Sequence, residues 1–113
     1  MMETMVTRAS LATGRRVTMR PGVDRVTLAY NSQNMLCYFY LEKAAEIPLH
    51  SHPPVQNGFV VKGRLRFLKG NGESFEAGPG DGYFFDANEV HGLEVLEAAE
   101  IIECFSPMRP EYV

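Results

Sequence analysis

Hydrophobic and polar residues alternate along most of this chain with a period of two, the spacing of β-strands that bury one face. Short alternating runs are separated by turn-forming residues, among them Pro21-Gly22, Gly70-Asn71-Gly72 and the glycine-rich segment 78–82. The pattern predicts strands at Arg25–Tyr30, Met35–Leu41, Glu46–Gly63, Arg64–Lys69, Glu73–Ala77, Tyr83–Phe85, Leu93–Leu96 and Glu100–Phe105. No segment keeps a helical period for more than a turn or two. We therefore predict an all-β sandwich or barrel.

Two segments depart from this one-faced pattern. Met35–Leu41 is apolar or aromatic on both faces, so we expect it to be covered on both sides, by the core and by a second sheet or subunit. Residues 1–20 show no clean period and predict a frayed arm followed by an edge strand, open to exchange with a partner subunit. Residues 21–113 are expected to form the barrel.

Composition narrows the class of protein. The chain has 113 residues, 45% hydrophobic and 22% charged, which suits a single domain with one core. No apolar run has the length of a membrane span, and the N-terminus lacks the apolar core of a signal peptide, so we expect a cytoplasmic protein. The net charge of -3 argues against nucleic acid as a partner. Cys37 and Cys104 lie in strand-like runs and are expected to stay reduced.

The three histidines carry the strongest chemical signal. His50 and His52 are two residues apart, a spacing that on a strand directs both imidazoles to one side. His91, which follows the glycine-rich segment, is the only remaining histidine that could supply a third nitrogen ligand. Neutral imidazoles suit Zn, Fe, Ni, Mn or Cu and do not select among these metals. A His-x-His pair also occurs by chance on exposed strands, but the third histidine and the glycine turns favour a metal site.

The segment around these histidines resembles the cupins, which are small β-barrels of jelly-roll type. The positions that match the two cupin motifs are His50, His52, Gly63, Gly80 and His91. The motif positions occupied by other residues are Ala44, Gln56, Asp86, Asn88 and Val95. The resemblance covers residues 44–95 and implies a single-domain jelly-roll barrel. It also implies a divalent transition metal (Zn, Ni, Mn or Fe) held by His50, His52, Gln56 and His91.

Gln56 stands where cupins usually carry a glutamate ligand. A neutral amide oxygen is an acceptable metal ligand and would leave the site its full positive charge, which attracts an anionic substrate. The alternative is that Gln56 only forms hydrogen bonds beside the metal. We favour the ligand role because the spacing fits the family position.

A narrower resemblance begins upstream and ends at the C-terminus. The segments MLCYFYLEKAAEIPLHSHP and ECFSPMRPEY are similar in layout to the single-domain pectin-degradation cupins of KdgF type. This resemblance spans residues 25–113 and implies an enzyme that ketonises 4,5-unsaturated uronates. Two departures leave room for another substrate: Pro54-Val55 replaces a usual His-Glu, and Glu103 replaces a usual aspartate.

Glu103, Phe105 and Ile101 share one strand face by alternation, but the sequence pattern alone leaves open whether that face points inward or to solvent. The resemblance favours the inward face, where Glu103 would be a carboxyl in a partly apolar cavity, the setting of a general acid or base. It also implies that Arg109 clamps a substrate carboxylate and that Phe105 contacts the substrate. Tyr38, Tyr40, Tyr83 and Phe85 are typical core residues, and we assign them no role.

The sequence therefore predicts a metal-dependent carbohydrate isomerase that acts on a small sugar acid and forms a homodimer. Two alternatives stay open. A three-histidine centre could bind Fe(II) and activate oxygen as a dioxygenase, and the same fold could serve a non-catalytic sugar-binding cupin.

Overall fold

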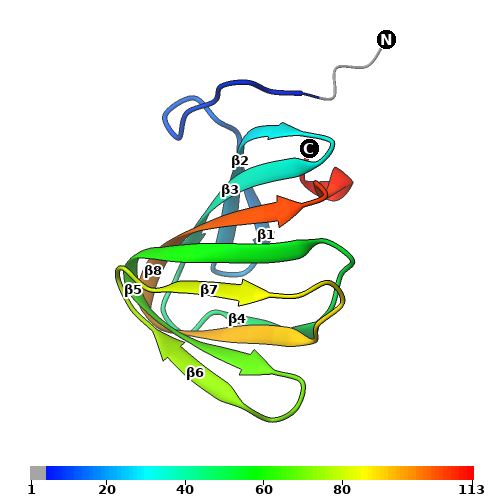
Figure 1. The fold of residues 1–113 in the computed structure, drawn as a ribbon. Coiled ribbons are helices and arrows are strands. Elements are labelled where there is room, and N and C mark those ends of the chain that lie inside the picture. The colour runs from blue at the N-terminus through cyan, green and yellow to red at the C-terminus, as the bar shows by residue number, and fades with distance from the viewer. Residues whose placement is uncertain (1–4) are drawn as a thin grey trace.

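The computed structural model describes residues 5–113 and is built almost wholly of strands (Figure 1). Its elements are β1 (Arg16–Arg20), β2 (Val23–Asn31), β3 (Asn34–Leu41), β4 (Glu46–His50), β5 (Val55–Lys69), β6 (Ser74–Ala77), β7 (Gly82–Phe85), β8 (His91–Ser106) and the 3-10 helix η1 (Pro110–Tyr112). The strands join in the order β1-β2-β3-β8-β5-β6, with β4 paired to β8 and β7 paired to β5. Every pairing is antiparallel. The all-β prediction is confirmed.

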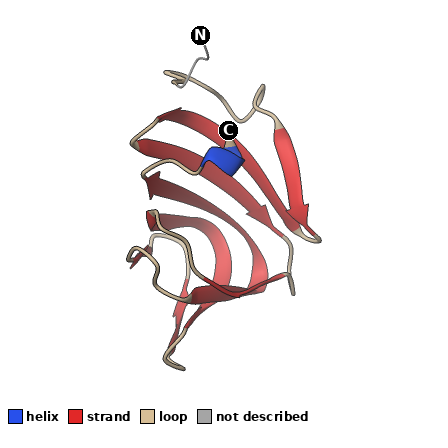
Figure 2. Cartoon of the chain, turned by 90° about the vertical axis from the view of Figure 1, so that its right-hand side faces the viewer, coloured by secondary structure: helices blue, strands red, loops and turns tan. Residues whose placement is uncertain are grey.

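The two longest strands, β5 and β8, pair along most of their length and form the spine of the fold. Predicting a turn at Gly63 between two separate strands was wrong, because β5 runs through this residue. Gly63 has a φ of 88° and lies where the register with β8 shifts, which identifies a β-bulge at a backbone conformation suited to glycine. Gly63 packs directly against Ala98 and Ala99 of β8. Both strands bend there, and the sheet curls around a core (Figure 2).

The core fills the inside of this curl and draws on alternate residues of the curved sheet. Its largest fully buried side chains are Phe67, Phe85, Phe105, Met35, Leu65 and Ile101. Cys37 is buried among them, whereas Cys104 is half-buried on the opposite face, and both are free thiols. The short predicted strand Tyr83–Phe85 is confirmed as part of β7.

The inner face of β3 is buried as predicted, and its outer face is covered only in part. The inner residues Met35, Cys37, Phe39 and Leu41 are all buried. On the outer face Tyr38 is buried, whereas Leu36 and Tyr40 are partly exposed. The expectation of cover on both sides is thus met only around Tyr38 within this chain.

The N-terminal part of the described chain adds the edge of the sheet. β1 pairs with β2 of the same chain, and Val6 forms an isolated bridge with Tyr30. The predicted frayed arm falls partly on residues 1–4, outside the described residues. Within residues 5–113, no helix is long and apolar enough to cross a membrane.

Candidate metal centre and its pocket

The three histidines meet at one end of the barrel. His50 ends β4 and His91 begins β8, and the two residues are direct partners across these strands, with ring centroids 4.5 Å apart. The His52 ring lies 5.5 Å from that of His50 and 5.1 Å from that of His91. One ligand nitrogen from each ring can be chosen so that all three lie within 4.8 Å of one another. Such a cluster is compact enough to hold a single ion.

The route by which His52 reaches the cluster differs from the prediction. We expected His50 and His52 to alternate on one strand, but β4 ends at His50, and His52 lies in the connection before β5. Pro53 and Pro54 follow directly and cannot donate backbone hydrogen bonds to a neighbouring strand, which ends the pairing there. His52 therefore approaches the other imidazoles from a turn.

All three rings are fixed by the same kind of hydrogen bond. The Nδ1 atoms of His50, His52 and His91 lie 2.9, 2.8 and 2.8 Å from the backbone carbonyl oxygens of Pro48, Pro54 and Glu89. A carbonyl oxygen can only accept, so each Nδ1 carries a proton. In a neutral ring the other nitrogen, Nε2, then presents a lone pair to the cluster, as metal-binding imidazoles do.

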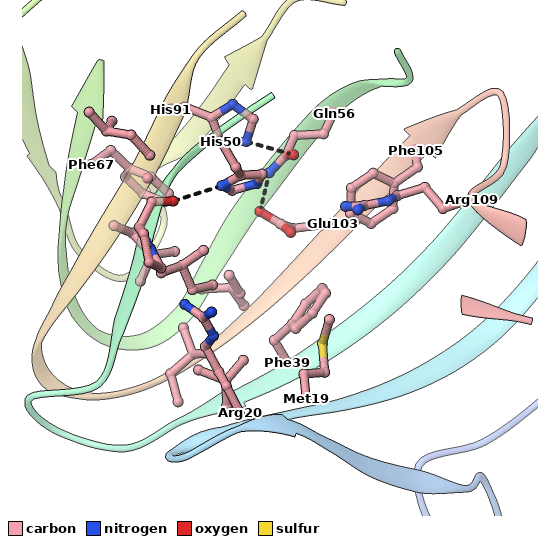
Figure 3. A pocket seen from close by; sticks show the side chains of 18 of the residues that line it. Met19, Arg20, Phe39, His50, Gln56, Phe67, His91, Glu103, Phe105 and Arg109 are labelled. Carbon is pink, nitrogen blue, oxygen red and sulfur yellow. Dashed lines mark hydrogen bonds between the residues drawn. The ribbon is translucent and has the colours of Figure 1, made fainter. Parts of the chain in front are cut away.

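Gln56 on β5 adds an oxygen to this nitrogen cluster. Its amide Nε2 donates to Oε2 of Glu103 at 2.8 Å, which turns the amide oxygen Oε1 toward the imidazoles (Figure 3). That oxygen lies 2.8 Å from His52 Nε2 and 3.1 Å from His91 Nε2. With Nδ1 protonated, these neighbours are all acceptors and repel one another unless a cation lies between them. The donor set therefore fits a divalent transition metal, as the sequence resemblance implied.

His52 and His91 are held in the neutral state that binds a metal. His52 and His91 are buried, and burial is the main reason that the pKa of each imidazole is lowered, that of His91 to about 4. The Arg109 charge also lowers the pKa of His52. The Phe85 ring stacks on His91 with centroids 4.4 Å apart and holds its orientation. Both rings thus stay neutral and able to bind metal at neutral pH.

Glu103 points inward, as the resemblance had favoured, and is the buried carboxyl beside the metal centre. It is 6% exposed. Tyr83 donates a 2.6 Å hydrogen bond to the same oxygen that accepts from Gln56. Burial raises the pKa of Glu103 to about 7, although these hydrogen bonds and the Arg109 charge oppose the rise. A carboxyl of this pKa can both take and give a proton near neutrality.

Tyr83 is the site residue that sequence reasoning missed. Tyr83 on β7 and Glu103 on β8 both pair with Gly58 of β5, which lies between them. A Cβ atom at Gly58 would collide with the phenol ring of Tyr83, so the ring crosses β5 only because residue 58 has no side chain. A glycine inside an otherwise apolar strand was the available signal of a close approach.

The metal centre opens into a pocket of about 410 Å³. Its polar lining consists of Arg20, His50, Gln56, His91, Glu103 and Arg109, and most of the remaining lining is apolar. Phe105 lines it too. The Phe105 ring lies edge-on to the ring of His52, with centroids 6.0 Å apart, and His52 itself lies behind the pocket wall. The structure thus brings together every residue that the sequence nominated. A pocket of this volume suits a small organic molecule.

Arg109 is held by aromatic rings at the wall of this pocket. Its guanidinium lies 4.2 Å from the ring centroid of Tyr112 and 5.1 Å from that of Phe105, and it pairs with exposed Glu111 at 3.1 Å. On Tyr112 a second guanidinium, that of buried Arg25, lies 4.3 Å from the ring centroid. These cation–π contacts fix Arg109. Its Nε and Nη2 atoms both donate to Oε2 of Glu111, which leaves the remaining N–H groups of the guanidinium available to an anion.

Comparison with protein families agrees with this geometry. Residues 37–105 match the family model described as "Cupin domain". The chain belongs to the cupin family. A comparison of this cupin with curated proteins finds no match.

Solved structures extend the comparison to the whole barrel. An RmlC-like cupin from Shewanella frigidimarina is 23% identical, with a TM-score of 0.92 over 98% of this chain and 100% of the other. KdgF from Halomonas sp. is 25% identical, with a TM-score of 0.86 over 92% of this chain and 96% of the other. A variant of oxalate decarboxylase from Bacillus subtilis has 19% identity and a TM-score of 0.77, and this cupin spans only 31% of its length.

Proposed function

We propose that this cupin is a metal-dependent isomerase that opens the ring of a 4,5-unsaturated uronate and converts the resulting enol into a ketone. The observation that carries the proposal is a buried carboxyl, Glu103, in the same pocket as three converging imidazoles and the Arg109 guanidinium. The likeness to KdgF at 25% identity supports it.

His50, His52, Gln56 and His91 would hold one divalent ion, Zn, Ni, Mn or Fe. When bound, it would supply Lewis-acid polarisation of a sugar oxygen. Because Gln56 is neutral, the ligands leave the charge of the ion uncompensated, and this favours an anionic substrate.

The other pocket residues bind the substrate and transfer its proton. Arg109 binds the substrate carboxylate with its planar fork, and Phe105 packs beside the sugar. Glu103 takes the proton of the anomeric hydroxyl while the bond between C1 and the ring oxygen breaks, which leaves an aldehyde and an enolate. Glu103 then gives this proton to C4, and the enolate oxygen on C5 becomes the ketone oxygen. No atom is gained or lost overall, and Tyr83 holds the carboxyl in place throughout.

The test is the loss of ultraviolet absorbance of a 4,5-unsaturated galacturonate. Purified protein loaded with Zn, Ni, Mn or Fe should abolish the absorbance of the conjugated substrate, and protein treated with a chelator should not. Glu103→Gln should lower kcat by a factor of about 10²–10⁴, the range of general acid–base catalysis. Unchanged absorbance with all four metals rules the proposal out. Oxygen uptake with Fe(II) alone would instead favour the dioxygenase, and binding without turnover the sugar-binding cupin.

We further propose that the protein works as a cytoplasmic homodimer. The outer face of β5 and β7 exposes Phe59, Val61 and Phe84, of which Phe59 is 47% and Phe84 57% exposed. Partly exposed Ile102 and Cys104 extend the same face onto β8. An exposed apolar surface of this kind is typical of an interface between subunits.

A further inference from the structure

The pocket has a second polar group far from the chemistry proposed above. One end carries the metal ligands, Glu103 and Arg109, and the other polar lining residue is Arg20, at the end of β1. Figure 3 shows the guanidinium of Arg20 directed into the pocket from below, whereas Arg109 reaches the pocket from the side of β8. The lining also includes the apolar residues Val23, Phe39, Leu41, Ile47, Leu93 and Ile101.

No carboxylate of residues 5–113 pairs with Arg20. Its Nη1 atom donates to the backbone carbonyl of Glu46 at 3.3 Å. Arg16 on the same strand differs, since its Nε lies 2.9 Å from Asp24 and it does not line this pocket. The guanidinium of Arg20 therefore keeps most of its five donors for a ligand.

The balance of charges points to what that ligand carries. Two guanidinium groups, Arg20 and Arg109, line the pocket. Arg109 is paired with Glu111, and among residues 5–113 Glu103 is the sole carboxylate in the lining. A metal ion would add further positive charge. One substrate carboxylate bound at Arg109 leaves the exposed guanidinium of Arg20, at the rim of the apolar part of the pocket, with N–H donors for a second anionic group.

We propose that Arg20 is a second anion-binding subsite and that the preferred uronate carries, besides its own carboxylate, a second anionic group, either a carboxylate or a phosphate. The class of sugar acid is taken from the proposed function, on which this inference rests. Arg109 binds one anionic group of the substrate beside the metal centre, and Arg20 binds the other at the β1 side of the pocket. The apolar side chains between them contact the carbon skeleton.

The experiment measures binding with three acids of six-carbon chains. Isothermal titration calorimetry on Zn²⁺-loaded protein compares gluconate, which has one carboxylate, with glucarate, which has two, and with 6-phosphogluconate, which has a carboxylate and a phosphate. The variants are Arg20→Gln and the matched control Arg16→Gln, which alters the same strand outside the pocket. Thermal unfolding of both variants checks that they fold like the wild type.

The wild type should bind glucarate or 6-phosphogluconate about five- to tenfold more tightly than gluconate, the gain expected from one partly exposed charge-assisted contact. The better dianion identifies the second group as carboxylate or phosphate. Arg20→Gln should abolish the preference and keep the affinity for gluconate, whereas Arg16→Gln should retain the preference. Equal binding of the three acids by the wild type, or equal losses for all three in Arg20→Gln, would overturn the inference. Because the readout is binding, a failure of uronate turnover leaves this result interpretable on its own.

Discussion

The hydroxyl of Tyr83 donates a 2.6 Å hydrogen bond to the carboxyl of Glu103. Tyr83 lies on β7 and Glu103 on β8, and β5 runs between these two strands. The same carboxylate oxygen accepts from Gln56, whose amide oxygen faces the imidazoles. The phenol, the carboxyl and the amide thus form one chain that ends at the metal centre. Such a buried chain of hydrogen bonds fixes both the place and the orientation of the carboxyl.

Removing the Tyr83 hydroxyl should therefore slow catalysis and leave Glu103 in the site. We expect Tyr83→Phe to lower kcat for the unsaturated uronate by a factor of about 10 to 100, because Glu103 loses a positioning partner but stays present. Tyr38→Phe is the matched control, since Tyr38 donates a 2.7 Å hydrogen bond to Glu100 on the outer face. Steady-state kinetics on both variants is the measurement. Similar losses in the two variants would show that the effect of Tyr83 is merely structural.

Gly58 should tolerate no side chain, because the ring of Tyr83 occupies the space that a Cβ atom needs. We expect Gly58→Ala to destabilise the fold by about 1–3 kcal/mol, the usual cost of overpacking. Gly82→Ala is the control: a Cβ atom there would meet only the Gly58 carbonyl oxygen, at an ordinary 3.6 Å. Urea unfolding of both variants gives the free energies. A stable Gly58→Ala protein with an unchanged midpoint would contradict the steric argument.

The sequence predicted the alternating residues of single strands well, but it did not predict contacts between side chains on different strands. Most strand and turn positions followed from the period of two, although the strands predicted at Leu93–Leu96 and Glu100–Phe105 form one strand, β8. The inward direction of Glu103 followed only from the resemblance to KdgF-type cupins. Continuity through Gly63 did not follow, because glycine favours a turn and a bulge equally and only the partner strand decides between them.

The contacts of the site show the same limit. The histidine cluster could be predicted because a motif fixes its members, although His52 reaches it from a turn. The bond between Tyr83 and Glu103 and the direction of Arg20 depend on the register and curvature of strands far apart in the sequence. No local pattern encodes that register.

Gln56 should contribute directly to metal affinity. We expect Gln56→Ala to weaken Zn²⁺ binding by a factor of about 10 to 100, in line with the loss of a metal-orienting partner or weak ligand. Gln33→Ala is the control, because Gln33 is exposed in the turn between β2 and β3 and does not line the pocket. Competition with a chromophoric chelator gives both dissociation constants. Equal affinities in the two variants would remove Gln56 from the metal site.

The raised pKa of Glu103 makes a prediction for stability in the metal-free protein. The unfolded chain releases this proton near its ordinary pKa of 4.5, whereas the folded protein holds it to about 7, so this residue costs stability as pH rises through that window. We expect the free energy of unfolding of Glu103→Gln, minus that of the wild type, to increase by about 1–3 kcal/mol between about pH 5 and 7.5.

The neighbouring histidines do not obscure this difference, since His52 and His91 are present in both proteins. Glu100→Gln serves as the control of opposite sign. The hydrogen bond from Tyr38 and the partner Lys62 lower the pKa of Glu100, so its contribution is lost only as pH falls below its ordinary range. Denaturant titrations across the pH range test both. A flat difference for Glu103→Gln would mean that its carboxyl is ionised in the folded protein throughout.

The last prediction concerns the outer face of β5 and β7. If Phe59 and Phe84 lie in a subunit interface, replacing both with serine should convert the dimer into a monomer, because the double change removes much of the exposed apolar area. Val90→Ser is the control, since Val90 is 41% exposed in the connection between β7 and β8. Light scattering coupled to size-exclusion chromatography gives the masses. The inner pocket residues do not reach this face, so the monomer should retain uronate binding. A wild type that elutes as a monomer at every concentration would refute the proposed dimer.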